Sequence, residues 1–254
     1  CEAIVSLFDS NYLYWLQKVN HQWKLVLVLT AHVDDLQISG SKVMRDWLHK
    51  RLEERFGPLK RETIPYTHAG IQLSRPAKNV IRLHQDAFCS KLNTTSIGAH
   101  RVDKPLDDLD KVETTTFRSL TCSALWATQT NPQEICQITS LQQALKTPKV
   151  KDLMSINTVI KRLKSPNREK FGLWYRKLKP PYRVLTVSDA SSANKRSDFA
   201  TEGIACLLTE DHLATVETDK DDFLDLSVNK YLAGKAHLLV CSSNKAKRVS
   251  HSTS

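Results

Sequence analysis

The stretch from residue 25 to residue 40, Leu-Val-Leu-Val-Leu-Thr-Ala-His-Val-Asp-Asp-Leu-Gln-Ile-Ser-Gly, constrains the fold more than any other part of the chain. A run of branched apolar residues leads into two adjacent carboxylates and leaves as an alternating segment, which predicts a buried β-hairpin with Asp34 and Asp35 at its tip. Neighbouring side chains of a regular strand point to opposite faces, so the two carboxylates can converge only if the backbone turns there. Clustered carboxylates repel each other, and a divalent cation is the usual partner that stabilises them. The tip is therefore the place where the sequence predicts metal chemistry.

An ordinary turn is the competing interpretation of the same tip, because Asp side chains commonly cap backbone N–H groups in turns. The tripeptide Val-Asp-Asp alone favours that interpretation. The order around it changes the balance: an apolar strand before, Leu-x-Ile-Ser-Gly after, and then an amphipathic helix. This order resembles the catalytic hairpin of the reverse transcriptases of copia-type retrotransposons, whose usual form is Tyr-Val-Asp-Asp-Leu-x-Ile-x-Gly. His32 stands where that family usually has Tyr.

Composition places the chain among soluble globular proteins, since 41% of its 254 residues are hydrophobic and 25% are charged. A net charge of +10 favours a polyanionic partner, because Lys and Arg gain affinity by releasing counterions from phosphates. No apolar run approaches the roughly 20 residues that span a bilayer, and the first residues given lack the basic region and cleavage site of a signal peptide. We therefore expect an intracellular protein that is neither secreted nor membrane-bound. A first residue other than Met suggests a fragment, and the six cysteines, which form no Cys-x-x-Cys pair, are expected to be reduced core thiols.

The segments on either side of the hairpin complete a small antiparallel sheet. Residues 3–16 alternate as strands around a turn at 9–11, and the period of residues 41–56 is helical, with an apolar face of Met44, Trp47, Leu48, Leu52 and Phe56. Residues 66–74 resemble the family's Phe-Leu-Gly-x-x-Ile element, a hairpin that holds the primer end. Gly70 would there allow close approach of another backbone or of a nucleic acid strand, although an ordinary bulge is the alternative. A strand at 81–85 and a short helix at 86–92 continue the family order.

The middle of the chain predicts a helical layer. Residues 101–113 are polar and predict a loop. The run Phe-Arg-Ser-Leu at 117–120, extended by the residues up to Pro132, resembles the family's Tyr-Arg-Ser-Leu-x-Gly-x-Leu run and predicts a helix that ends before that proline. Two further amphipathic helices are predicted at 133–146 and 149–164.

Residues 161–183 carry nine Lys or Arg side chains interleaved with aromatic rings and close on Pro180-Pro181. Such a face suits nucleic acid, because cations meet phosphates while rings stack on bases. The alternative is a solvated linker whose aromatics anchor it to the next domain. Together with His32 and Gly70, which the resemblance brings in, the predicted nucleic-acid-binding residues are His32, Gly70, Lys161, Arg162, Lys164, Trp174, Arg176, Lys177 and Lys179.

Beyond the two prolines, strands are predicted at 182–191, 199–208 and 236–243, and the first of them presents Asp189 near its end. This order resembles the opening of the ribonuclease H domain in the same polyproteins. The expected fold class is α+β, with three predicted parts. Residues 1–100 would form part of a polymerase palm (an antiparallel sheet plus helices), 101–180 a helical thumb or connection layer, and 181–254 a truncated, ribonuclease H-like mixed sheet.

The activity that the resemblance implies is RNA-directed DNA synthesis with ribonuclease H. Two Mg²⁺ ions would bridge the primer end and the incoming nucleotide, with Asp34 and Asp35 as catalytic and metal-binding residues and Asp189 in the same role in the ribonuclease H part. The partners would be an RNA template and a DNA primer or an RNA·DNA hybrid, with deoxynucleotides as substrates of the intact parent. A third palm carboxylate and the other ribonuclease H acids are not in the sequence, so we expect the chain to be inactive on its own. The alternatives are a basic nucleic-acid-binding module without catalysis and an interaction domain that binds no nucleic acid.

Overall fold

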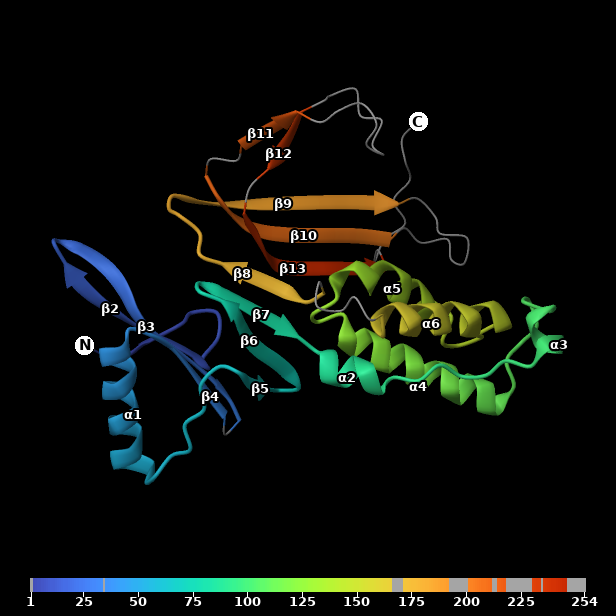
Figure 1. The fold of residues 1–254 in the computed structure, drawn as a ribbon, viewed down its shortest axis with the longest axis horizontal. Helices are drawn as coiled ribbons and strands as arrows, with labels where there is room; N and C mark the ends of the chain where they lie inside the picture. Colours follow the sequence, from blue (N-terminus) through green and yellow to red (C-terminus); the bar gives the residue numbers. More distant parts are fainter. Residues whose placement is uncertain are drawn as a thin grey trace. The chain divides into compact units, whose positions relative to one another are not determined.

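The computed structural model describes residues 2–33, 35–165, 171–191, 201–211, 214–217, 230–233 and 235–245. It shows a mixed α+β fold, which confirms the class expected from the sequence. Within these residues the strands form two four-stranded sheets, one three-stranded sheet and a two-stranded ribbon, and all of the strand pairs are antiparallel (Figure 1). The chain forms two compact units, Cys1–Thr63 and Ile64–Ser254.

The first unit is a four-stranded sheet in the order β1-β2-β3-β4 with one helix, α1. The turn between β2 and β3 consists of Asn20 and His21, which both adopt left-handed backbone angles (φ 51° and 62°) as a tight two-residue hairpin requires. The predicted strands at 3–16 and the predicted hairpin at 25–40 are confirmed. The elements are β1 (Ile4–Val5), β2 (Tyr12–Val19), β3 (Gln22–His32), β4 (Asp35–Gly40) and α1 (Lys42–Phe56).

Helix α1 begins at a local capping signal. The Ser41 hydroxyl accepts a hydrogen bond from the Met44 N–H at 3.3 Å, and Gly57, at φ 84°, ends the helix. Of the predicted apolar face, Leu48 is buried with Trp15 of β2 and Leu27 and Leu29 of β3. Phe56 does not belong to this core, because its side chain is 71% exposed in the last turn of the helix.

The second unit contains a four-stranded sheet in the order β5-β6-β7-β8. The predicted hairpin at 66–74 is confirmed, with a two-residue turn of Ala69 and Gly70 at φ 45° and 76°. Strand β8 comes from much later in the chain and pairs with β7 from Val80 opposite Arg176 to Leu83 opposite Leu173. The strands are β5 (Tyr66–His68), β6 (Ile71–Ala77), β7 (Val80–His84) and β8 (Leu173–Arg176).

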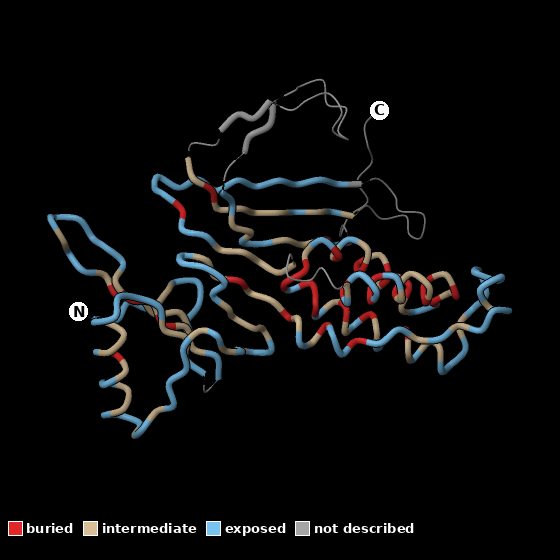
Figure 2. Tube along the Cα trace, in the orientation of Figure 1, coloured by how far each residue is buried: buried red, intermediate tan, exposed pale blue. Residues whose placement is uncertain are grey.

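A helical layer holds the largest buried core, which Figure 2 shows as the concentration of red along the helices. The predicted helices are present, but α4 begins inside the segment predicted as a loop. Asp110 accepts a hydrogen bond from the Glu113 N–H at 2.8 Å, and the Glu113 carboxylate accepts one from the Asp110 N–H at 3.0 Å, so a capping box starts the helix early. No helix among the described residues is long and apolar enough to cross a membrane. The elements are α2 (Asp86–Lys91), α3 (Ala99–Val102), α4 (Lys111–Ala127), the 3₁₀ turn η1 (Pro132–Glu134), α5 (Ile135–Gln143) and α6 (Val150–Leu163).

The remaining strands of this unit form a sheet in the order β13-β10-β9, with a separate ribbon of β11 and β12. Helix α5 packs on β13, where the Thr139 hydroxyl donates a hydrogen bond to the Ser243 carbonyl at 3.0 Å. The three strands predicted after the two prolines are confirmed. The sheet was expected to be mixed, but its described strands are only antiparallel. The strands are β9 (Tyr182–Ser191), β10 (Thr201–Glu210), β11 (Ala214–Glu217), β12 (Lys230–Ala233) and β13 (Ala236–Lys245).

Candidate functional site

At the tip of the β3–β4 hairpin, two residues of the sequence, Val33 and Asp34, separate His32, the last residue of β3, from Asp35. The ladder runs from Leu27 opposite Gly40 to His32 opposite Asp35, so Asp35 is the first residue of β4. Asp34 lies outside the described residues. Val33 is 92% exposed and has φ 56°, a left-handed conformation that a β-branched residue rarely adopts. Strained backbone of this kind gathers at functional sites, where the surrounding structure maintains it.

The register places polar side chains in a row on one face of the sheet. Cross-strand partners share a face, and along the hairpin the pairs alternate between faces. His32 opposite Asp35 therefore lies on the same face as Thr30 opposite Gln37, and Thr30 is also opposite Tyr12 of β2. The buried core of this unit, with α1, occupies the other face. We call the row Tyr12, Thr30, His32, Asp35 and Gln37 the hairpin face.

The opposite end of the hairpin admits only glycine. A Cβ on Gly40 would lie 2.5 Å from the Val26 carbonyl oxygen and 2.8 Å from Leu27 Cδ1, both closer than such contacts allow. The final Gly of the pattern Asp-Asp-Leu-x-Ile-x-Gly is therefore a packing requirement of this hairpin. It fixes the close approach of β3 and β4 at the base of the turn that carries the carboxylates.

The hairpin face offers oxygen ligands of the type that Mg²⁺ prefers, namely carboxylate, hydroxyl and amide oxygens. Among the residues that the structure describes, however, no group of three or more His, Cys, Asp and Glu side chains lies close enough to hold a metal ion. Asp34 is not among the described residues, so this absence concerns only Asp35 and its described neighbours.

Gly70 has a structural explanation within the second unit. Its φ of 76° belongs to the two-residue turn between β5 and β6, where glycine is favoured. A Cβ at this position would lie 3.3 Å from Cζ2 of Trp126 in α4, so the turn approaches an indole ring closely. The proposed contact of Gly70 with nucleic acid stays a prediction.

The basic residues of the 161–183 stretch fall into two groups. Lys161, Arg162 and Lys164 lie at the end of α6, and all three are exposed. Arg162 forms an ion pair with the buried Glu134, with Nε and Nη2 at 2.9 and 2.6 Å from its carboxylate oxygens. The hydrogen bond to Glu134 raises the pKa of Arg162, so this charge is already compensated inside the helical layer.

The second group, Arg176, Lys177 and Lys179, is exposed at the end of β8 and just after it. The aromatic residues of the same strand are packed within the protein. The Arg82 guanidinium lies 5.6 Å from the Trp174 ring centroid, and the Tyr175 hydroxyl donates a hydrogen bond to the Leu238 carbonyl of β13 at 3.2 Å. These contacts match the anchoring role that the linker interpretation gives to the aromatics, while the three cations stay available to a partner.

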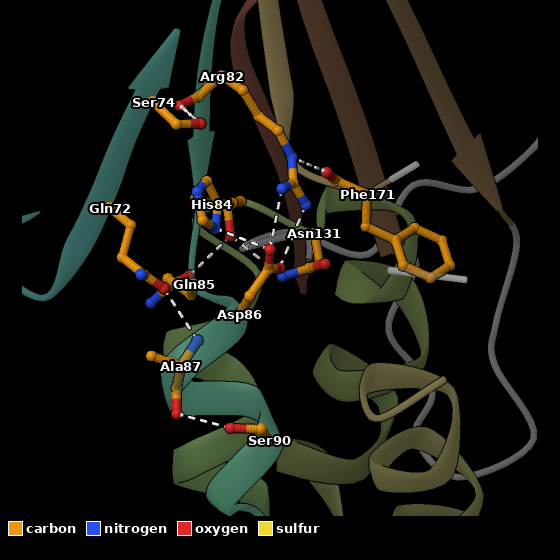
Figure 3. Close-up of polar contacts among 11 residues, drawn as sticks. Gln72, Ser74, Arg82, His84, Gln85, Asp86, Ala87, Ser90, Asn131 and Phe171 are labelled. Carbon is orange, nitrogen blue, oxygen red and sulfur yellow. Dashed lines mark hydrogen bonds and ion pairs between the residues drawn. The ribbon is translucent and has the colours of Figure 1, made fainter. Parts of the chain in front are cut away.

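Sequence reasoning missed a polar cluster where β7 meets α2, which Figure 3 shows. Arg82, only 8% exposed, donates from Nε to the Phe171 carbonyl at 2.8 Å and pairs with Asp86 at 2.9 Å. His84 Nδ1 lies 2.9 Å from the same carboxylate. Arg82 and His84 occupy alternate positions of a strand, a pattern that predicts a solvent-facing side. Strand β8 pairs with β7 and places the Trp174 ring next to Arg82. This pairing joins segments far apart in the sequence, so no local pattern predicts it.

A second set of buried polar groups joins the start of α2 to the end of α4. Gln85 is fully buried; its Nε2 donates to the Trp126 carbonyl at 3.2 Å and its Oε1 accepts from the Thr130 hydroxyl at 3.0 Å. Asn131 Nδ2 donates to the Ala127 carbonyl at 2.7 Å. Satisfied networks of this kind fix one relative placement of the elements that they join.

Asp189 lies on β9 opposite Gly203, and its side chain is exposed. The described residues bring no second and third acid to it. One carboxylate cannot hold two ions, so the described residues around Asp189 do not by themselves form a two-metal site.

Comparison of the chain with protein-family models, with curated proteins and with solved structures gives no match.

Proposed function

We propose that the chain is a segment of a copia-type retrotransposon reverse transcriptase followed by the start of the ribonuclease H domain. The observation that supports this most is the β3–β4 hairpin. Val33, the residue that follows β3, has a left-handed conformation, and Asp35 lies directly opposite His32. Asp35 thus belongs to a polar face of an antiparallel sheet, and the other face of this sheet is packed against a helix.

Such a face suits the end of a nucleic acid strand. Hydroxyl and amide groups of Tyr12, Thr30 and Gln37 can hydrogen-bond to sugar and phosphate oxygens of a strand lying across the sheet. Asp34 and Asp35 would hold Mg²⁺, whose chemistry is to neutralise the charge that develops on phosphate oxygens during nucleotide transfer. Two adjacent carboxylates do not fit a two-ion site, so the proposed role of this chain alone is binding and not synthesis.

The first experiment compares ligands in a fluorescence-anisotropy titration of the whole chain. An RNA·DNA hybrid with a recessed DNA end should bind more tightly than duplex DNA of the same sequence, and Mg²⁺ should strengthen hybrid binding. The double change Asp34→Asn with Asp35→Asn should remove the Mg²⁺ effect. The adjacent, exposed pair Asp107 and Asp108, changed to Asn in the same way, is the matched control and should leave the Mg²⁺ effect in place.

Equal affinity for the hybrid and for duplex DNA, together with no effect of Mg²⁺, would contradict the assignment. A primer-extension assay with deoxynucleotides and Mg²⁺ tests the second half of the proposal. No extension is expected from this chain. Metal-dependent extension that Asp34→Asn abolishes would show that the two carboxylates suffice after all. RNA cleavage in a hybrid that Asp189→Asn abolishes would likewise overturn the expected lack of ribonuclease H activity.

A second candidate function is a basic nucleic-acid-binding module without catalysis, and the exposed cations Arg176, Lys177 and Lys179 favour it. In that case the affinity falls steeply with salt and does not change when both hairpin aspartates become Asn. Replacing the three cations with Gln should reduce the slope of log affinity against log salt by about 3, because each phosphate contact contributes roughly one unit. A control with the same loss of charge replaces exposed lysines of the first unit, Lys18, Lys24 and Lys50.

A further inference from the structure

Strand β9 is an edge strand with an unusual charge pattern. It pairs with β10 along its whole length, and no other described strand pairs with its outer edge. All of its side chains from Tyr182 to Ala190 are exposed, as the continuous pale blue of β9 in Figure 2 shows. A long open edge presents unpaired backbone N–H and C=O groups to any strand that can pair with it.

One face of β9 carries a self-complementary row. In strand order the row is Arg183, Leu185, Val187 and Asp189: a cation, two apolar side chains and an anion. The two apolar members are 42% and 53% exposed, which is a large exposed fraction for residues of a sheet. The Arg183 side chain is 62% exposed although it pairs with Asp211, so it still reaches solvent.

We propose that β9 pairs with β9 of a second copy of this chain, antiparallel about a two-fold axis at Thr186. This register places Arg183 opposite Asp189 of the copy at both ends, and Leu185 opposite Val187 of the copy between them. Opposite charges and apolar side chains directly across an antiparallel pair stabilise it, whereas like charges destabilise it. The three-stranded sheet becomes a continuous six-stranded sheet of two copies.

Of the neighbouring registers, only the one with its axis at Thr186 places the two charged residues opposite each other. Moving the axis to Leu185 places Asp189 opposite Pro181 of the copy, and moving it to Val187 places Asp189 opposite Leu185. Neither alternative sets Arg183 against Asp189, and both leave Asp189 opposite a non-polar residue. A two-fold interface is made by the same patch on both copies, and a row that pairs with its own reverse meets that condition. The inference is independent of the nucleic acid function proposed above.

The test is a charge-swap cycle measured by sedimentation velocity over a range of protein concentrations, without nucleic acid. Wild-type chain should form dimers. With Arg183→Asp alone or Asp189→Arg alone, positions 183 and 189 carry like charges and face each other twice across the dimer. Either change should therefore weaken dimerisation by about tenfold or more. An equimolar mixture of these two variants should dimerise again, because every cross-strand pair is then of opposite charge. Asp211→Asn is the control for the lost intramolecular ion pair and should leave dimerisation unchanged.

A wild-type chain that stays monomeric, a dimer indifferent to both single changes, or a mixture that fails to associate although circular dichroism shows both variants folded would each overturn the proposal. Should a variant not fold, hydrogen exchange of the wild type decides. Amides of residues 182–190 should exchange more slowly as protein concentration rises, and exchange that does not depend on concentration would overturn the β9 pairing.

Discussion

The left-handed conformation of Val33 leads to a quantitative prediction about the hairpin tip. A non-glycine residue in this region costs about 1–2 kcal/mol, and a β-branched side chain lies at the upper end. Because the Val33 side chain is 92% exposed, removing it loses almost no buried apolar surface. Val33→Gly relieves the strain but adds backbone entropy to the unfolded chain, which costs roughly 0.5–1 kcal/mol. The expected net gain in unfolding free energy is therefore about 0.5–1 kcal/mol.

Val33→Asn separates the two contributions. Asn keeps a Cβ, so the unfolded chain gains little freedom, and its side chain tolerates the left-handed region. We expect it to stabilise the first unit by about 1 kcal/mol, as much as Gly or more. Val43, in the first turn of α1 and 77% exposed, is the matched valine with ordinary backbone angles. Val43→Asn should not stabilise the unit: the free energy of unfolding should either stay within about 0.5 kcal/mol of the wild-type value or fall.

The assay is native-state hydrogen exchange of the β3 amides between Leu25 and Ala31, which reports the opening free energy of this unit. Slower exchange in both Val33 variants, and not in Val43→Asn, is the expected result. Unchanged or faster exchange in Val33→Asn would refute the reasoning, because it would mean that valine costs nothing at this turn. Should either variant also alter Mg²⁺-dependent hybrid binding, the conformation of the turn contributes to the position of the carboxylates.

Three further predictions concern the core and the ion pairs. Gly40→Ala should destabilise the first unit by about 1–3 kcal/mol in urea unfolding, because the new methyl group meets a carbonyl oxygen at 2.5 Å. Arg162→Ala should cost about 3 kcal/mol in thermal unfolding because it leaves the buried Glu134 unpaired, and replacing both residues with Leu should cost less. Hydrogen bonding to Arg101 holds the pKa of Glu113 below its ordinary value of 4.5. The stability from this pair is then present above that value and lost as pH falls through the lowered pKa, so Glu113→Gln should flatten the acid limb of a stability–pH curve.

Local signals were enough to predict most of the elements. The hairpins and helices are short-range structures whose apolar spacing and turn residues lie next to each other in the chain, and Ser41 and Gly57 even predict the two ends of α1. The start of α4 was predicted too late because the helical period begins at Phe117, whereas the capping box of Asp110 and Glu113 starts the helix in a polar segment.

The periodicity of the sequence does not predict which strands pair when they lie far apart in the chain. The pairing of β8 with β7 buries Arg82, which the alternation of β7 predicts to be exposed. Phe56 shows the opposite failure, since its helical spacing predicts burial but its side chain is 71% exposed in the last turn of α1. For the candidate site, the sequence indicated the turn and its carboxylates. The identity of their neighbours on the hairpin face depends on the register with β2, and that required the structure.

The core of Cys1–Thr63 contains four buried side chains, whereas the helical layer of the other unit has a much larger buried cluster. Calorimetry of the whole chain should then show two heat-absorption peaks, with the smaller unit melting first. A ligand that binds the hairpin face shifts only the lower peak, by an amount set by its concentration relative to its dissociation constant. A ligand of the exposed cations after β8 shifts only the upper one. The thin core thus lets a single melting curve report which of the two proposed surfaces a nucleic acid occupies.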